Sequence, residues 1–122
     1  MYLEDLPPQC PPAEAEDGNY GVLWRVKTST SLDVCPSDFE SSAKQGKPCP
    51  PKVDLCRWSS CSLFETEHGV TSLKKLPKFK GKGHFSLSIS RGVGRALRGS
   101  GGHVDFWFYA TVDPSSLVLK NG

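Results

Sequence analysis

Cations and hydroxyl groups dominate one stretch of the sequence, residues 68–104, which contains no Asp or Glu. Lysine and arginine supply positive charge there, while serine hydroxyls and glycine amides supply directional donors. This combination suits the binding of phosphate or carboxylate groups. The candidate binding residues in the stretch are Lys74, Lys75, Lys78, Lys80, Lys82, Arg91, Arg95 and Arg98.

The small net charge of the whole chain conceals an uneven distribution of charged residues along the sequence. The formal net charge is +2, yet residues 1–67 hold six Lys and Arg against eleven Asp and Glu. A local positive field recruits anions even on a nearly neutral protein. We therefore expect an acidic protein partner or a phosphate-bearing ligand. A solvated basic rim without a ligand stays open, and so does nucleic acid, although only Phe79 and Phe85 could stack with bases there.

Three residues could instead serve a nucleotide-handling enzyme. Arg25, inside an early apolar run, would clamp phosphate, Ser88 would line the pocket, and His103 would act as acid or base. His103 and Asp105 would share one face of a strand, either as an acid–base pair or as a hydrogen-bonded rim. The simpler interpretation of Arg25 is an ion pair with an acid on a neighbouring element.

The order of these segments resembles that of the bacterial-toxin type of ADP-ribosyltransferase. The resemblance rests on Arg25, on the serine-bearing strand that ends at residues 88–91, and on an aromatic strand running into Asp113-Pro114. It implies that Arg25 meets the phosphates of NAD and that the serines line the nicotinamide pocket. The family's late glutamate motif has no counterpart after Asp113, so an NAD- or nucleotide-dependent transferase stands as the alternative to a binding module.

A second resemblance spans residues 10–117. The segments CPP, LWRV, PSDFES, CSLFET, LKKLPKFKGK, SRGVG and HVDFWFYATVDPSSL are similar to a group of small bacterial proteins of unknown function. The resemblance implies a bacterial or phage origin and a cytosolic location. It draws attention to Arg25, Phe39, Leu76-Pro77, Gly94, His103 and Trp107, and it adds Trp107 to the candidate binding residues.

Five cysteines, an odd number at irregular spacing, argue against a complete disulfide framework. We expect reduced thiols that pack as small hydrophobic side chains. A zinc site drawing on Cys49, Cys56, Cys61 and His68 is a minor alternative, because paired C-x2-C spacing is absent. We therefore expect no metal, and no cofactor unless the NAD-dependent alternative holds.

Hydrophobic periodicity predicts the elements that must position these residues. Runs at 20–26, 61–66, 84–90 and 104–112 favour strands, and SLVL near the end of the chain favours a further short strand. Residues 37–46, introduced by a Ser37/Glu40 capping box, and 66–76, capped by Thr66, favour short helices. Residues 49–60 and the glycine-rich residues 92–102 are expected to be loops.

Together these patterns predict an α+β fold with a mainly antiparallel sheet of four or five strands and two short helices on one face. Residues 1–18 read as an extended, proline-rich acidic arm, and residues 19–122 as a single domain. We expect a small soluble binding module, an adaptor or an immunity-like antagonist, rather than an enzyme. With neither a leader nor a membrane-spanning run in the sequence, we expect a cytoplasmic protein that does not contact membranes.

Overall fold

The computed structural model describes residues 1–121 and has an α+β fold built on one antiparallel sheet. The strands are β1 (Gly21–Val26), β2 (Cys61–Phe64), β3 (His84–Ile89), β4 (Gly94–Arg98), β5 (His103–Phe108) and β6 (Val118–Asn121). The helices are α1 (Leu55–Trp58) and α2 (Glu67–Leu73), and single 3-10 turns cover Pro36–Phe39, Pro77–Phe79, Ser100–Gly102 and Pro114–Leu117. None of the helices in this described part of the chain has the length and apolar character needed to cross a bilayer.

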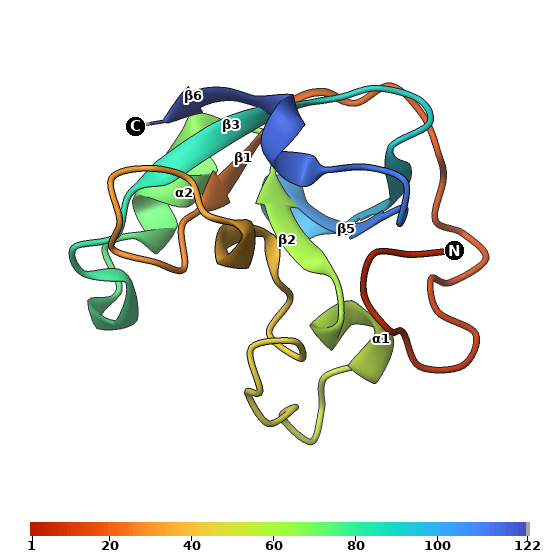
Figure 1. Cartoon of the computed structure of the whole chain (residues 1–122). Helices are drawn as coiled ribbons and strands as arrows, with labels where there is room; N and C mark the ends of the chain where they lie inside the picture. The colour runs from red at the N-terminus through yellow and green to blue at the C-terminus, as the bar shows by residue number, and fades with distance from the viewer. Residues whose placement is uncertain (122) are drawn as a thin grey trace.

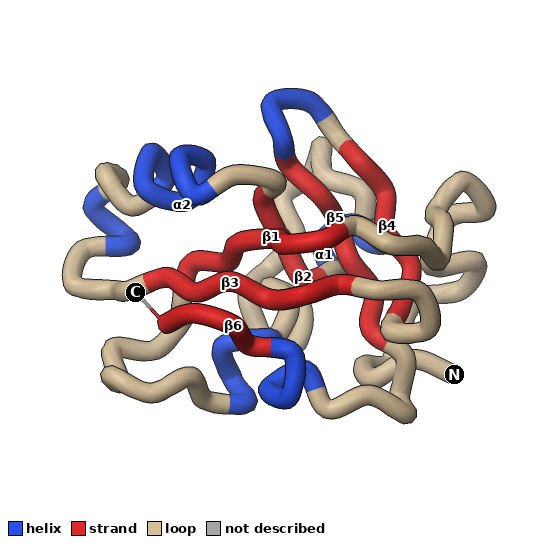
Figure 2. The backbone as a smooth tube through the Cα atoms, turned by 90° about the horizontal axis from the view of Figure 1, so that it is seen from above, coloured by secondary structure: helices blue, strands red, loops and turns tan. Residues whose placement is uncertain are grey.

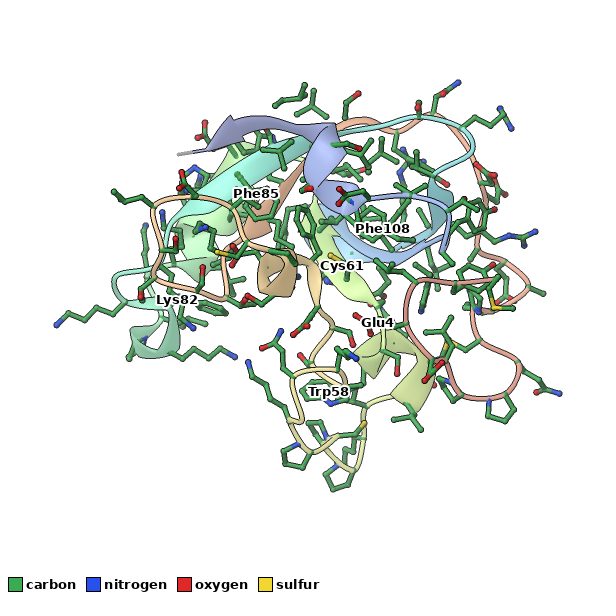
Figure 3. All side chains as sticks on the ribbon, viewed as in Figure 1. Glu4, Trp58, Cys61, Lys82, Phe85 and Phe108 are labelled. Carbon is green, nitrogen blue, oxygen red and sulfur yellow. A yellow bond between two sulfur atoms is a disulfide. The ribbon has the colours of Figure 1, made fainter. Side chains whose placement is uncertain are left out.

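The sheet has the strand order β4-β5-β2-β1-β3-β6 and curves strongly (Figure 1). Seen from above, β1, β3 and β6 run side by side while β4 and β5 are turned away from them (Figure 2). The curvature brings the two halves together over one core. The ring of Phe39 lies 5.3 Å from that of Phe85 on β3 and 6.3 Å from that of Phe108 on β5. Figure 3 shows Phe85, Phe108 and Cys61 gathered in this interior.

The predicted strand pattern is confirmed for β1, β2, β3 and β5, and a last strand, β6, follows near the expected place. The predicted number of strands is too low because β4 was assigned to a glycine-rich connection. Gly94 serves close packing here. A Cβ at this position would lie 2.3 Å from the main-chain oxygen of Trp107 and 2.7 Å from the ring of Phe106. Only glycine lets β4 approach β5 so closely.

Helix α2 begins where the sequence predicts, after Thr66, but it ends at Leu73, three residues before the predicted end. The hydroxyl of Thr66 accepts a hydrogen bond from the amide of Gly69, and Val70 is fully buried. Gly69 also lets the helix lie close to the sheet, because a Cβ there would be 3.0 Å from the ring of Phe64. Pro77 begins the separate 3-10 turn Pro77–Phe79.

Two predictions about helices are wrong. Residues 37–46 form no α-helix, and only the 3-10 turn Pro36–Phe39 is present, because Asp38 turns back to accept a hydrogen bond from the amide of Cys35. Residues 49–60, predicted as a loop, contain α1. The side chain of Asp54 caps this helix by accepting a hydrogen bond from the amide of Cys56.

The expectation of reduced thiols is wrong for one pair of cysteines. Cys10 and Cys56 form a disulfide that ties the N-terminal arm to α1. The arm is fastened elsewhere too. Glu4 accepts hydrogen bonds from the amide and hydroxyl of Ser41, and Glu16 exchanges both main-chain hydrogen bonds with Ala96 of β4.

Candidate functional site

The pairing of β2 with β5 sets four polar side chains on the face of the sheet that points away from the core. Ser62 lies opposite Asp105, and Phe64 lies opposite His103. Since side chains alternate along each strand, Ser60, Ser62, His103 and Asp105 share this outer face. Their hydrophobic neighbours Cys61, Leu63, Val104 and Phe106 point into the core.

These polar side chains contact one another. The hydroxyl of Ser62 lies 2.5 Å from Nε2 of His103. Asp105, only 3% exposed, accepts hydrogen bonds from the Ser60 hydroxyl at 2.8 Å and from Nε of Arg57 at 2.7 Å. Its Oδ1 lies 3.9 Å from the same Nε2 of His103. The result is a buried carboxylate, held by Arg57, beside a serine–histidine pair.

The serine–histidine pair opens into a cavity of about 500 Å³, here called the serine cleft. Its lining comes from β2 and β5 of the sheet, and from α1 and the loop before it. Trp58 of α1 is among the lining residues, and Figure 3 shows it in the lower part of the view. The lining residues are Ser42, Lys52, Val53, Asp54, Arg57, Trp58, Ser60, Ser62, His103 and Asp105.

A second cavity, of about 340 Å³, adjoins the first and is here called the lysine groove. It shares Ser42, Ser62 and His103 with the serine cleft, so these three residues stand between the two hollows. Its lining contains no Asp or Glu. The lining residues are Arg25, Val26, Thr28, Ser42, Gln45, Lys47, Ser62, Phe64, Leu73, Lys78, Phe79 and His103.

The electrostatics of the lysine groove are those of crowded cations. Partial burial lowers the pKa of Lys47, and repulsion from Lys82, Lys78 and Arg25 lowers it further. Among the described residues, no salt bridge joins Lys47, Lys78 or Lys82 to a carboxylate. An anion placed among these ammonium groups would relieve their mutual repulsion.

One wall of the groove is fixed by Arg25 and by a buried ion pair behind it. The Arg25 guanidinium donates to the main-chain oxygens of Asp38, Glu40 and Ser62 at 2.7–2.9 Å. Asp38 is fully buried and lies 2.9 Å from the ammonium of Lys27, which is 2% exposed.

The charge on Asp38 is held by many donors. Burial opposes its ionisation, but hydrogen bonds from the amides of Cys35 and Ser29, together with the Lys27 ammonium, outweigh burial and hold the pKa of Asp38 well below its ordinary value. The amide of Thr28 donates to the same carboxylate at 2.9 Å. This carboxylate therefore fastens the segment 27–38 against the sheet.

The three residues of the nucleotide-handling alternative do not come together. Arg25 and His103 both line the lysine groove, whereas Ser88 lies on β3 opposite Val22 and is exposed outside it. Arg25 is 7% exposed, and the bonds it makes are to backbone carbonyls. The sequence predicts an acidic partner for Arg25. In the structure its partners are instead three main-chain carbonyls of the adjoining loop and strand.

The basic stretch predicted as one surface divides into two parts. The lysines lie around α2 and the turn before β3, and Figure 3 shows Lys82 at that end of the molecule. The arginines lie on or beside β4 and meet the acidic arm or β2. Arg91 and Arg95 donate to the main-chain oxygens of Asp17 and Ala15, and Arg98 pairs with Glu65 at 2.8 Å.

Trp107 is not available to a partner. It is 2% exposed, and its indole N–H donates to the main-chain oxygen of Cys56 at 3.3 Å. Its proposed binding role is therefore wrong: the tryptophan packs β5 beneath α1. Phe85 is fully buried as well, which leaves Phe79 as the half-exposed aromatic residue among the lysines.

The zinc alternative loses one ligand to the disulfide at Cys56. Cys61 is buried in the core, where burial raises the pKa of its thiol, while Cys35 and Cys49 are partly exposed. No cluster of three or more His, Cys, Asp or Glu residues in the range 1–121 could hold a metal ion.

Sequence reasoning missed Ser62, Lys47 and Arg57. Ser62 sits in a short alternating strand, but nothing in the sequence shows which strand lies beside it.

No protein-family description matches the chain, and neither a curated protein nor a solved structure matches it. The two family resemblances therefore stay predictions.

Proposed function

We propose that the protein is a small binding module, an adaptor or antagonist, that engages an acidic partner at the lysine groove. The observation that carries this proposal is the cavity itself: Lys47, Lys78 and a histidine line it, and no carboxylate does. Cations that are clustered without acids repel one another, which raises the free energy of the unliganded protein. A bound anion relieves this repulsion. The arginines of β4, by contrast, already have partners within the chain.

The groove offers both charge and direction to an anion. Its ammonium groups attract carboxylate or phosphate oxygens, while the hydroxyl of Ser42 and the Gln45 amide hydrogen that Glu40 does not accept can donate hydrogen bonds. The proposal narrows the expected basic surface from residues 74–98 to its lysine half and adds Lys47, which lies outside that stretch.

Binding of polyglutamate, measured by titration calorimetry, tests the proposal. The double variant Lys47→Gln/Lys78→Gln should weaken binding at least about ten-fold, since each charge-assisted contact is worth about 1.5 kcal/mol or more. Its matched control is Lys75→Gln/Lys80→Gln, which removes the same charge from exposed lysines outside the groove. Equal weakening by both double variants would show diffuse attraction and overturn the groove as the site.

A second candidate function is contact with a nucleic-acid backbone, and Phe79 favours it. Its ring lines the groove, and the Lys78 ammonium lies 5.2 Å from the ring centre. An aromatic ring among cations is the arrangement that single strands stack on. Titration with oligo-dT would show an affinity that falls steeply with salt, because bound cations displace counterions. Affinity for oligo-dT that is insensitive to Phe79→Leu would count against this candidate.

The cytoplasmic location also stays a prediction, and the Cys10–Cys56 disulfide weighs against it, because disulfides persist mainly in oxidising compartments. Thiol titration of the unfolded protein, purified without reductant, decides whether the bond forms. Three reactive cysteines, Cys35, Cys49 and Cys61, would indicate the disulfide.

A further inference from the structure

Ser62 and His103 stand where the serine cleft meets the lysine groove, and their side chains contact each other there. We propose that Ser62 is a nucleophile, activated by His103, that takes the acyl group of an ester whose acidic part lies in the lysine groove. The choice of an acidic ester rests on the proposed function. The reactivity of Ser62 does not.

The first support is distance. The Ser62 hydroxyl and Nε2 of His103 are 2.5 Å apart, within the range in which a histidine takes the proton of a nucleophile. For Ser62 to donate, Nε2 must carry the lone pair and Nδ1 the proton. A surface serine–histidine pair in the same protein shows the contrast. Ser72 and His68, both exposed on α2, lie 3.3 Å apart, and neither lines the serine cleft or the lysine groove.

The second support is that the pair is held by the sheet. Ser62 and His103 come from hydrogen-bonded neighbouring strands, β2 and β5, whose register fixes their separation. The ring of Phe64 packs edge-on against His103 with the centres 5.3 Å apart. A nucleophile and base carried on strands keep their geometry without the entropy loss that a loop would suffer.

The third support is the charge beside the histidine. When His103 takes the serine proton it becomes a cation, and Oδ1 of Asp105 lies 3.9 Å from the nitrogen that carries the charge. Arg57 and Ser60 hold the carboxylate there. Because Asp105 approaches Nε2 and not Nδ1, it acts as a counter-charge and does not select the tautomer, unlike the aspartate of serine-protease triads.

The fourth support is access. His103 is 29% exposed, and both members of the pair line the two hollows. An ester lying across the junction would place its carbonyl carbon above Ser62, with an acidic group among Lys47 and Lys78. Its leaving group would extend into the serine cleft, where 500 Å³ is room for a small organic group.

The reaction closes with water as the only co-reactant. The Ser62 oxygen bonds to the ester carbonyl carbon as its proton passes to Nε2 of His103. The bond to the leaving alkoxide then breaks, and that alkoxide takes the proton from His103. A water molecule next gives its proton to His103 and its oxygen to the acyl carbon. Finally Ser62 leaves with the proton, and the free carboxylic acid departs.

Diisopropyl fluorophosphate, a neutral reagent, tests the nucleophile independently of the lysine groove. Its phosphorus bonds to a reactive serine as fluoride leaves, and peptide mass spectrometry finds the modified residue. We expect modification at Ser62, none at this peptide in Ser62→Ala, and a rate at least about ten-fold lower in His103→Gln, since a positioned base contributes about 100-fold or more. The matched control Ser72→Ala should react at Ser62 as the unaltered protein does.

Two results would overturn the nucleophile: no modification at Ser62, or the same rate in His103→Gln as in the unaltered protein. Thermal midpoints show whether each variant is folded. If Ser62→Ala does not fold, the rate in His103→Gln decides. An unaltered protein that binds polyglutamate but is not modified at Ser62 would refute the nucleophile and leave the proposed function standing.

Two p-nitrophenyl esters test the substrate class. The hemisuccinate carries a carboxylate and the acetate does not. We expect faster hydrolysis of the hemisuccinate, and we expect Lys47→Gln/Lys78→Gln to abolish that preference, whereas Lys75→Gln/Lys80→Gln, outside the groove, should keep it. Equal rates for the two esters, with Ser62 still reactive, would overturn the acidic substrate and leave the nucleophile standing.

Discussion

Replacing Asp38 with asparagine should destabilise the protein by about 3–5 kcal/mol, because the change leaves a buried ammonium without its counter-charge. Lys27 is 2% exposed, and after the substitution the main-chain oxygen of Asp33 remains as its partner. The carboxylate also accepts hydrogen bonds from three backbone amides, at Thr28, Ser29 and Cys35. Thr28, which lines the lysine groove, is held in place by one of these bonds.

The reciprocal change gives an internal comparison. Lys27→Met removes the ammonium but leaves Asp38 with its three amide donors, so the carboxylate stays well solvated by the protein. We expect this variant to cost about 1–2 kcal/mol, in the range of a single charge-assisted hydrogen bond. The asymmetry follows from the number of remaining partners, which is large for the acid and small for the base.

Urea unfolding monitored by tryptophan fluorescence measures both variants, and thermal unfolding should show a fall of about 12–20 °C for Asp38→Asn. A loss in Lys27→Met equal to or greater than that in Asp38→Asn would refute the reasoning, since it would mean that the ammonium and not the carboxylate organises the segment. A loss below about 1 kcal/mol in both would mean that the pair is solvated.

Acidity gives a second way to test Asp38. Because the folded state holds the pKa of Asp38 below that of the unfolded chain, the unfolded chain takes up the proton first as the pH falls. The stabilisation is therefore fully present well above about pH 4 and is lost progressively below it. The difference in stability between the unaltered protein and Asp38→Asn should shrink over that acidic range.

Three further changes have expected outcomes. Replacing Cys10 and Cys56 with serine should cost about 4 kcal/mol of unfolding free energy, from the loop entropy of a cross-link spanning 46 residues. Gly94→Ala should cost about 3 kcal/mol or more in thermal unfolding, because its Cβ would lie 2.3 Å from the main-chain oxygen of Trp107. Since the pKa of Lys47 is lowered, polyglutamate affinity should begin to fall with rising pH below the range of an ordinary lysine.

Each of these changes has its own control. Cys35→Ser removes a partly exposed free thiol and should be nearly neutral. Gly18→Ala adds a Cβ at an ordinary 3.8 Å from the Tyr20 ring and should be tolerated. Disulfide or glycine variants no less stable than these controls would contradict the packing described. A Lys47→Gln variant with the same alkaline fall in affinity would assign the titration to another lysine.

The elements that the sequence predicts correctly are those whose pattern is local. Phe85, Leu87 and Ile89 alternate with polar residues, and β3 forms there with all three buried. Thr66 caps α2 as expected. The strand β4 was missed because Gly94 usually marks a turn, and its need for glycine arises from contact with β5, which no local pattern records.

The candidate site divides in the same way. His103 and Asp105 are two residues apart on one strand, so their common face follows from the sequence alone. Ser62 lies forty-one residues before His103 in the sequence. It joins them only because β2 pairs with β5. Lys47 enters the lysine groove from an irregular loop whose path is fixed by distant contacts, so nothing in its neighbours could have placed it there.

The main-chain hydrogen bonds between Glu16 and Ala96 affect whether two copies of the protein can pair through the edges of their sheets. The strand β4 ends the sheet on one side, and a free edge there would offer N–H and C=O groups to any extended chain that met it. The arm occupies this edge with a segment of the same molecule. A variant without residues 1–18 would leave this edge uncovered, and the sheets of two copies could then join edge to edge. The bridge between Glu16 and Ala96 therefore covers part of an edge that could otherwise pair with a second copy.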